Sequence, residues 1–332
     1  MTSTGGRALA ADRRRPRASG EPGQVDCAVI IVTYNSAADI TGLLESLPAA
    51  AAGLTLRTVV VDNGSTDATA RLVGAFPGVC YVETGANLGY AGGINAGREH
   101  AGECAALLVL NPDAVLEAGA LREMAMALDD PRVGMVAPML LDADGRIYPS
   151  LRRAPTLARA IGDGLLGSRI GRRPGWLSVM VRAESRYCQR HAVDWATGAA
   201  LLVSAACDRV VGRWDERFFL YSEETDYAAR ARDAGFRVEY VPTARVRHRG
   251  GGSGQSTALT ALSAVSRIRY MEKRRQWPRA YRAAVILHEL LRSGHPGHRT
   301  ALRFVIRRSR WPALIRSLQV RPAPEAASQE MP

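Results

Sequence analysis

The feature that most restricts the fold of this 332-residue chain is a series of short apolar runs, each followed by a polar turn and a helix-like segment. The clearest runs are residues 26–34 (DCAVIIVTY), 56–62 (LRTVVVD) and 104–110 (CAALLVL), with shorter ones at 79–84 and 133–138. Continuous apolar runs of this length are typical of parallel strands that are buried on both faces. Their alternation with helices predicts a doubly wound α/β sheet.

Polar side chains gather where these runs end. In such a sheet, ligands bind beyond the carboxyl ends of the strands. The pattern therefore predicts a ligand site at one edge of the sheet. The polar residues concerned are Thr33, Tyr34, Asn35, Asp62, Asn63, Asn87, Asn111 and Asp113.

Two common nucleotide-binding loops are missing from the sequence. The first two strand–helix turns have no GxGxxG, which argues against a dinucleotide oxidoreductase, and there is no GxxxxGKS/T loop. Residues 87–97 instead read NLGYAGGINAG and enter a short predicted helix. The glycines here, which include Gly89 and Gly93, are either flexible turn residues or a backbone that approaches a ligand, with Asn95 as a hydrogen-bonding side chain.

A cluster of carboxylates stands in residues 218–226, which read FFLYSEETD. Glu223, Glu224 and Asp226 repel one another, so such a cluster tends to persist where a metal, a substrate hydroxyl or a basic partner uses it. The following YAARARDAG is helix-like and stops at Gly235, which puts the acids in a first turn. Acids in a first turn are also ordinary caps, and this segment alone favours neither reading.

The second half of the chain returns to strand-like patterns after a less regular stretch at 139–190. Residues 193–204 read VDWATGAALLVS, and Trp195, Thr197 and Gly198 precede the apolar part. Trp195 is a candidate for substrate contact, with plain core packing as the alternative.

A further strand is predicted at 236–241, and His248 follows it at the start of HRGGGS. An isolated histidine is usually structural. A histidine between a strand and a glycine run, beyond an acidic cluster, is a better candidate for a metal ligand.

Charge divides the chain into unequal parts, although the total is +12. Residues 1–24 carry five arginines and two acids and predict a disordered basic tail. Residues 25–256 are nearly neutral and predict the main folded domain. Residues 257–321 carry 15 basic and two acidic side chains, net +13, and predict a basic helical arm, followed by a flexible tail at 322–332.

The arm alternates basic residues with apolar and aromatic ones at helical spacing. This pattern is typical of an interfacial amphipathic helix attracted to anionic lipid. The alternative is a solvated arginine-rich face packed on the catalytic domain. Nucleic acid is not expected as a partner, because no motif of a nucleic-acid-binding fold accompanies the arginines. The apolar positions are Ile268, Met271, Trp277, Val285, Leu287, Leu290, Leu291 and Trp311.

The cysteines and the hydropathy predict a cytoplasmic protein. The five cysteines are scattered, with no CxxC pair, which favours free thiols over a disulfide framework or a zinc site. The N-terminus lacks the apolar segment of a secretory signal. No apolar run reaches the roughly 20 residues needed to span a bilayer.

Seven of these segments together resemble one enzyme family. VIIVTYNS, VVVDNGSTD, NLGYAGGINAG, LLVLNPDA, ATGAALLVS, WDERFFLYSEETD and HRGGGS occur in that order. They closely resemble the inverting family 2 glycosyltransferases of GT-A fold, above all the bacterial rhamnosyltransferase branch. The resemblance covers roughly residues 26–275 and implies a mostly parallel, Rossmann-like nucleotide-sugar transferase domain.

The resemblance implies a role for each polar strand end. Residues at the ends of the first, second and fourth predicted strands, together with the glycine-rich segment, would hold the nucleotide-sugar donor. Trp195, Thr197 and Gly198 would meet the acceptor. The donor residues are Thr33, Tyr34, Asn35, Asp62, Asn63, Asn87, Gly89, Gly93, Asn95, Asn111 and Asp113.

The resemblance also implies a metal and a catalytic base. Asn111-Pro112-Asp113 stands where the family has its DXD motif, so Asp113 would bind Mg²⁺ or Mn²⁺, with His248 as a second ligand. Glu224 stands at the position of the base that deprotonates the acceptor. Relatives usually have Asp there, so Glu223 and Asp226 remain alternatives. The first DXD position is Asn, which coordinates more weakly than Asp.

The expected activity is transfer of L-rhamnose from dTDP-L-rhamnose to a lipid-linked or polysaccharide acceptor of the cell envelope, at the inner face of the membrane. A UDP-sugar donor (galactofuranose or N-acetylglucosamine) is the alternative within the class. A noncatalytic binding protein is the alternative outside it, and the joint presence of Asp113, Glu224 and His248 weighs against it.

Overall fold

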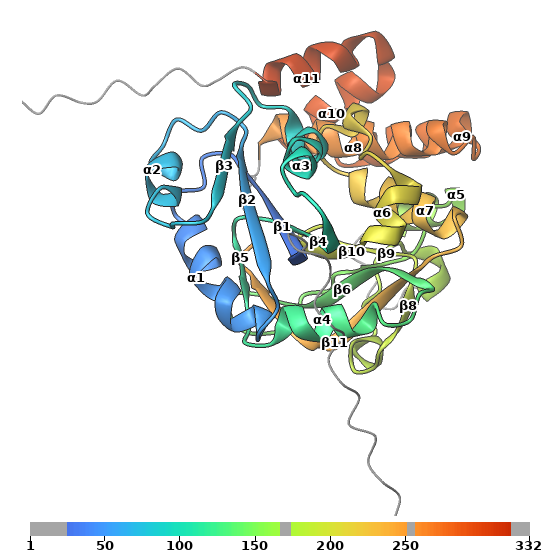
Figure 1. The fold of residues 1–332 in the computed structure, drawn as a ribbon. Helices are drawn as coiled ribbons and strands as arrows, with labels where there is room; N and C mark the ends of the chain where they lie inside the picture. Colours follow the sequence, from blue (N-terminus) through green and yellow to red (C-terminus); the bar gives the residue numbers. More distant parts are fainter. Residues whose placement is uncertain (1–24, 167–173, 251–255, 320–332) are drawn as a thin grey trace, which may run out of the picture.

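The computed structural model describes residues 25–166, 174–250 and 256–319, so the tails predicted at 1–24 and 322–332 lie outside the described residues. In the described part, a nine-stranded sheet has the order β3-β2-β1-β4-β10-β6-β11-β5, with β8 paired to β11 (Figure 1). β1, β2, β3 and β4 run parallel, and β6 is parallel to β11. The fold is the expected α/β type with a mostly parallel sheet.

The strands of the large sheet are β1 (Val25–Thr33), β2 (Leu56–Asp62), β3 (Cys80–Glu83), β4 (Cys104–Leu110), β5 (Ala114–Leu116), β6 (Val133–Leu141), β8 (His191–Val193), β10 (Ala200–Ser204) and β11 (Arg237–His248). A small sheet pairs β7 (Leu151–Arg152) with β9 (Trp195–Ala196). The helices up to residue 250 are α1 (Ile40–Ala51), α2 (Thr69–Val73), α3 (Gly89–Glu99), α4 (Ala120–Ala127), α5 (Leu157–Leu166), α6 (Ala205–Val211) and α7 (Glu223–Asp233). Those beyond are α8 (Thr257–Lys273), α9 (Pro278–Leu291), α10 (Pro296–Ile306) and α11 (Trp311–Gln319). Short 3₁₀ turns are Gly175–Leu177, Glu184–Tyr187, Glu216–Phe218 and Arg308–Arg310.

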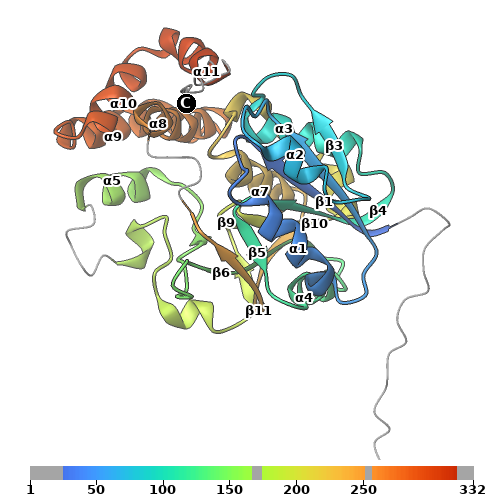
Figure 2. The same cartoon turned by 90° about the vertical axis from the view of Figure 1, so that its left-hand side faces the viewer.

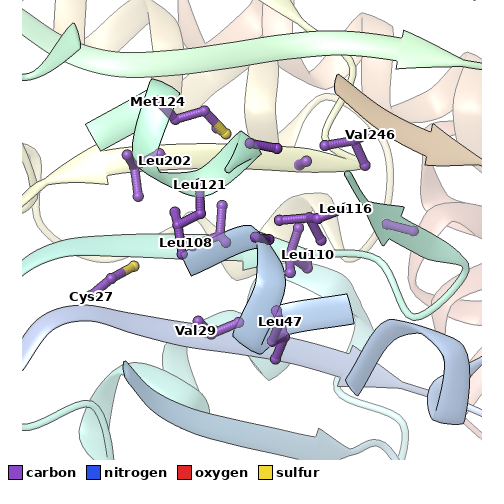
Figure 3. Close-up of a cluster of buried hydrophobic side chains, with 14 of the residues drawn as sticks. Cys27, Val29, Leu47, Leu108, Leu110, Leu116, Leu121, Met124, Leu202 and Val246 are labelled. Atoms are coloured by element: carbon purple, nitrogen blue, oxygen red, sulfur yellow. The ribbon is translucent and has the colours of Figure 1, made fainter. Parts of the chain in front are cut away.

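Alternate residues of the strands face two cores. Val29, Leu108 and Leu110 pack with α1 and α4 on one face of the sheet (Figure 3). Ile30 and Val109 pack with α3, α6 and α7 on the other face. Burial on both faces explains why these strands read as unbroken apolar runs.

Helices α8–α11 form a third core on one side of the sheet-bearing body (Figures 1 and 2). Ile268, Met271, Val285 and Trp311 are buried in it, and Phe218 and Phe219 pack against them. The predicted basic arm is thus helical, and half of its predicted apolar positions pack inward. The other four, Trp277, Leu287, Leu290 and Leu291, are exposed.

Two local expectations need correction. Residues 87–97 are mostly helix, since α3 begins at Gly89. The strand expected at 236–241 extends to His248, because β11 continues alongside β6 and also pairs with β5. The local sequence did not predict β5.

Candidate active site

The ends of β1 and β2 are joined by hydrogen bonds into one polar rim. Asp62 is buried and accepts from the Ser65 backbone N–H at 3.0 Å and from the Tyr81 hydroxyl at 2.6 Å. Thr33 Oγ1 lies 3.4 Å from Asp62 Oδ1. The structure therefore brings Thr33 and Asp62 together, as the strand pattern predicts.

Asn35 links the same two loops. Its backbone has a φ of 51°, in the left-handed region where asparagine is tolerated better than most residues. Its N–H donates to Ser65 Oγ at 2.8 Å, and its Oδ1 accepts from Thr66 N–H at 2.8 Å. Tyr34 lies beside it with an exposed ring. These contacts fix the rim without using Tyr34, whose side chain stays open to solvent.

The glycine-rich segment packs against the protein itself. A Cβ on Gly93 would lie 2.5 Å from Val32 Cγ1, so α3 lies directly on β1. Gly89 has a φ of +74°, and a Cβ there would lie 2.3 Å from the Phe219 carbonyl oxygen. The sequence suggested that these glycines let the backbone approach a ligand. In the structure, both glycines instead let it approach the protein's own backbone and core.

The asparagines around this segment hold it in place. Asn87 Oδ1 accepts from Gly89 N–H at 2.9 Å, and Asn63, which is buried, donates to the Gly89 carbonyl at 2.9 Å. Asn95 is also buried; its amide donates to the Trp214 carbonyl and accepts from Trp214 N–H, both at 2.9 Å. This position does not fit the donor-binding role expected for Asn95, because its hydrogen bonds anchor the segment before the acids.

The loop before the acids is held in an unusual backbone conformation. Phe219, Tyr221 and Ser222 have φ values of 64°, 67° and 69°, which non-glycine residues seldom adopt, and each costs on the order of 1–3 kcal/mol. Neighbouring elements hold the loop: Tyr90 N–H donates to the Phe219 carbonyl at 2.6 Å. From α8, Ser266 Oγ donates to the Leu220 carbonyl at 3.0 Å. Strain concentrated here is consistent with a functional loop.

Glu223 and Glu224 open α7 directly after this loop. Within the described residues, the Oε2 atoms of both side chains are buried and have no hydrogen-bond partner. Burial raises the pKa of Glu224 to about 7, although backbone hydrogen bonds and the charge of Arg152 lower it in part. Burial and the neighbouring Glu224 charge raise the pKa of Glu223 well above its usual range. The pair therefore holds a proton near neutral pH.

Asp226 has a different environment from the other two acids. It is fully buried, but Lys273 Nζ lies 2.7 Å from Oδ1, and Arg230 Nε donates to Oδ2 at 2.8 Å. Lys273 comes from α8, so this ion pair fastens α8 to α7. A cation lies beside each oxygen, although Oδ1 has no hydrogen-bond partner among the described residues, so these surroundings disfavour Asp226 as the base.

Gly198 lies against Glu224. A Cβ on Gly198 would be 3.7 Å from Glu224 Cβ and 3.8 Å from Tyr90 Cε1, and the Tyr90 hydroxyl donates to the Gly198 carbonyl at 3.1 Å. Thr197 is paired with the Ser150 carbonyl, 3.2 Å from its Oγ1. The segment predicted to meet the acceptor therefore forms one wall around Glu224.

Trp195 is half-buried and its indole N–H donates to the Arg153 carbonyl at 2.9 Å. Trp195 also lines a cavity that reaches Thr225, next to Glu224 in sequence. Trp195 thus combines core packing with access to the cavity, and the two readings of this residue are compatible.

Asn111, Asp113 and His248 meet at the ends of β4 and β11. His248 Nε2 lies 3.2 Å from Asp113 Oδ1 and 3.3 Å from Asn111 Nδ2. β5 pairs with the end of β11, which places Ala114 opposite His248. Residues 111 and 248 are far apart in sequence, and this pairing is what brings them together.

The donor set of this trio suits a divalent cation. Burial acts to raise the pKa of Asp113, but the hydrogen bond and charge of His248 outweigh it and lower that pKa, so the carboxylate is ionised. His248 Nδ1 is buried and has no hydrogen-bond partner among the described residues. A carboxylate, an amide oxygen after rotation of Asn111 and an imidazole form a ligand set that Mn²⁺ accepts, whereas Mg²⁺ prefers oxygen alone.

Sequence reasoning missed several residues of this centre. Tyr90 lies in a quoted motif, but nothing marked it as a neighbour of the acids. Arg152 acts on Glu224 by charge although it comes from the irregular stretch. Ser266 supports the loop from the predicted arm, and no local signal could have shown it.

Comparisons with known proteins show the family of this chain. A family model described as glycosyl transferase family 2 matches residues 28–181. Over 255 residues the chain is 33% identical to an N-acetylglucosaminyl-diphospho-decaprenol L-rhamnosyltransferase of Mycobacterium tuberculosis, an alignment that covers 73% of this chain and 82% of the relative. The chain is a family 2 glycosyltransferase.

More distant relatives of this glycosyltransferase share part of its length. A low-salt glycan biosynthesis hexosyltransferase, Agl10 of Haloferax volcanii, is 29% identical over 62% of this chain and 62% of its own. Among solved structures, GalNAc-T7 with UDP, GalNAc and Mn²⁺ superposes with a TM-score of 0.53 at 13% identity. That match covers 76% of this chain and only 48% of the other, and it shows the fold alone.

Proposed function

We propose that this glycosyltransferase moves L-rhamnose from dTDP-L-rhamnose to a lipid-linked cell-envelope acceptor, with inversion at the sugar. The observation that carries the catalytic part is Glu224, whose buried Oε2 atom has no partner among the described residues and whose pKa is raised to about 7. The mycobacterial relative, whose name states rhamnosyl transfer to a diphospho-decaprenol acceptor, supports the donor sugar and the acceptor class.

The polar rim is proposed to hold the nucleotide. Asp62 and Thr33 lie at the carboxyl ends of neighbouring parallel strands, where α/β sheets bind ligands. Tyr34, at the same strand end, has an exposed side chain whose ring is suited to stacking on the nucleotide base. Asn63, Asn87 and the glycines act indirectly, by fixing α3 beside the rim.

Asp113 and His248 are proposed to hold Mg²⁺ or Mn²⁺, with Asn111 as a weaker third ligand. The bound cation would offset the negative charge of the departing nucleoside diphosphate. The residues of the chain contribute an ionised carboxylate at Asp113 and a buried imidazole at His248, 3.2 Å apart.

Glu224 is proposed as the general base. It takes the proton of the acceptor hydroxyl while that oxygen bonds to the anomeric carbon, and the bond from that carbon to the diphosphate oxygen breaks on the opposite face. The electron pair of the broken bond leaves with the nucleoside diphosphate. A base with a pKa near 7 is matched to a neutral operating pH, and the nearby Arg152 charge favours its ionised form.

The arm is proposed to dock on an anionic membrane surface through α9. Leu287, Leu290 and Leu291 lie at helical spacing on α9, and Trp277 directly precedes the helix. These four residues, here named the α9 stripe, have 43, 54, 61 and 74% of their surface exposed. The opposite side of the helix, with Val285, is buried in the third core. The net charge of +13 in residues 257–321 adds attraction of about 1 kcal/mol per basic residue near the lipid. None of the helices among the described residues is long and apolar enough to cross a bilayer.

The donor is tested by thermal unfolding and transfer assays with dTDP-, UDP- and GDP-sugars, with and without Mn²⁺. A ligand that binds the native state alone raises the unfolding midpoint. We expect a metal-dependent shift and product formation with dTDP-L-rhamnose. A shift and turnover with a UDP-sugar instead would overturn the donor, and turnover with none of them would overturn the function.

Membrane docking is tested by flotation of the full chain with vesicles of phosphatidylglycerol or of phosphatidylcholine. We expect binding to the anionic vesicles that weakens with salt and is lost in the L287S/L290S/L291S variant. V210S is the matched control, because Val210 is an equally exposed apolar residue on α6. Equal binding by the stripe variant and the wild type would contradict this surface.

A further inference from the structure

A cavity of about 750 Å³ lies between α5, α8, α9 and α10. Figure 2 shows α5 beside α9 on this side of the molecule. The wall nearest the catalytic centre contains Ser222 and Thr225, which flank Glu223 and Glu224 in sequence. Its volume falls within the range of roughly 300–1,000 Å³ that is usual for small-molecule sites. The cavity therefore has room for part of a substrate and adjoins the proposed base.

The lining of this cavity has a surplus of positive charge. Its acids are already engaged: Glu289 Oε2 lies 2.7 Å from His298 Nδ1, and Asp163 accepts from Ser178 Oγ at 3.0 Å. The arginines that line it outnumber these two acids, and they are Arg152, Arg182, Arg267 and Arg292. No hydrogen bond or ion pair engages the guanidinium of Arg182 or Arg292 within the described residues.

Two long helices begin at the cavity. Ser256 and Thr257 at the start of α8 and Gly297 in the first turn of α10 all belong to its lining. Ser256 Oγ accepts from Leu259 N–H and His295 Nδ1 accepts from Gly297 N–H, so these two donors are already paired. What the helix starts contribute is the positive end of each helix dipole, which attracts anions. The helix N-termini and the arginines therefore both favour binding of an anion in the cavity.

A cation fits this cavity less well, although His288, Glu289 and His298 have ligand atoms within 4.8 Å of one another. Arg267 Nη2 lies 3.5 Å from Glu289 Oε1 and already supplies positive charge to that carboxylate. Burial, followed by the charges of Arg267 and Arg292, lowers the pKa of His288 to about 4. The charges of Arg267 and Arg292, which oppose a proton on His288, also oppose a divalent cation there.

We propose that this cavity binds the diphosphate group of the acceptor, with Arg292 and Arg182 as its main contacts. The inference rests on the proposed function for the identity of the acceptor, but the anion site itself stands on the cavity alone. A diphosphate held here lets the sugar attached to it extend toward Thr225 and Glu224. The lipid that follows the diphosphate would then leave on the side of α9, whose outer face carries the stripe.

The anion site is tested first without catalysis, by calorimetric titration of the full chain with inorganic pyrophosphate in the presence of a chelator. The chelator removes the metal that diphosphate binding at Asp113 would need. We expect binding that falls at least tenfold in R292Q and in R182Q, as is typical for loss of a charged hydrogen bond. R279Q is the matched control, because Arg279 is exposed at the other end of α9 and does not line the cavity.

The acceptor assignment is tested by transfer kinetics with two acceptors, one with a diphosphate between sugar and lipid and one simple alkyl glycoside. We expect R292Q to raise KM for the diphosphate acceptor about tenfold or more. KM for the donor and for the alkyl glycoside should stay unchanged. A rise in the donor KM instead would assign the cavity to the nucleotide and overturn the proposal.

Failure of this inference and failure of the proposed function give different results. Pyrophosphate binding that depends on Arg292, without rhamnosyl transfer to any acceptor, would keep the anion site and overturn the function. Rhamnosyl transfer with no pyrophosphate binding, and with R292Q equal to R279Q, would keep the function and overturn the site. Tight binding of Zn²⁺ alone that is lost in H298A, with no pyrophosphate binding, would also overturn it.

Discussion

Asp113 and Glu224 are the two carboxylates of the proposed active centre, and their surroundings are opposite. Asp113 sits 3.2 Å from His248 Nε2, which holds its pKa below the usual range despite burial. Glu224 is half-buried, its buried Oε2 has no hydrogen-bond partner among the described residues, and desolvation raises its pKa to about 7. The same chemical group is thus kept ionised at one end of the centre and kept ready to take up a proton at the other. Neighbouring groups and desolvation, rather than residue type, decide which carboxylate stays ionised and which can take up a proton.

The largest expected effect comes from removing the proposed proton acceptor. E224Q keeps the size of the side chain but cannot accept the proton, so kcat should fall by about 10³-fold, within the range usual for general base catalysis. Steady-state kinetics measure this, with donor binding as the control for an intact site. E224Q activity within tenfold of wild type would transfer the role to Glu223.

A smaller loss is expected at the other carboxylate. D113N should lower activity and Mn²⁺ affinity by at least about 10–100-fold, the size of loss seen even for groups that only support a metal ligand. Activity measured against Mn²⁺ concentration checks this. Excess Mn²⁺ should partly rescue D113N and should leave E224Q inactive, and equal rescue of both would remove the distinction between the two carboxylates.

The pH profile should show the raised pKa of Glu224 directly. Because the base must be ionised, kcat/KM should fall about tenfold per pH unit below a midpoint near pH 7. Buffers from pH 5.5 to 8.5 at saturating Mn²⁺ are sufficient. A rate that is level across that interval would show that no group with this pKa controls the transfer.

The smallest effect is on stability, and it has the opposite sign to the effect on activity. Glu224 has a folded pKa of about 7 against a usual value of 4.5, so its ionisation costs folding free energy as pH rises between these values. E224Q lacks this cost and should be more stable than wild type at pH 8 by roughly 1–3 kcal/mol. Urea denaturation at pH 8 and pH 4.5 measures the difference, which should vanish at the lower pH. Lower stability of E224Q at pH 8 would contradict the desolvation of Glu224.

The sequence was sufficient to predict the central parallel strands and the edge of the sheet at which the candidate site lies. The apolar runs at 26–34 and 104–110 became β1 and β4 in parallel register, and Asp62 and Asp113 lie at or directly beyond the carboxyl ends of their strands. These predictions succeed because the burial and the direction of a strand can be inferred from the local pattern of apolar and polar residues. The acid cluster was also visible, since three carboxylates in four residues need no structure to be seen.

Only the tertiary structure showed which of the three clustered acids are not neutralised by a cation. Asp226 is neutralised by Lys273, 47 residues away in sequence, whereas the buried Oε2 atoms of Glu223 and Glu224 have no hydrogen-bond partner in the part of the chain that the structure describes. It also decided that the glycines at 89 and 93 pack against Phe219 and Val32 rather than a ligand. Sequence determines which groups are present and their local geometry. Burial and the charge of distant neighbours set their pKa and availability, and these exist only once the chain has folded.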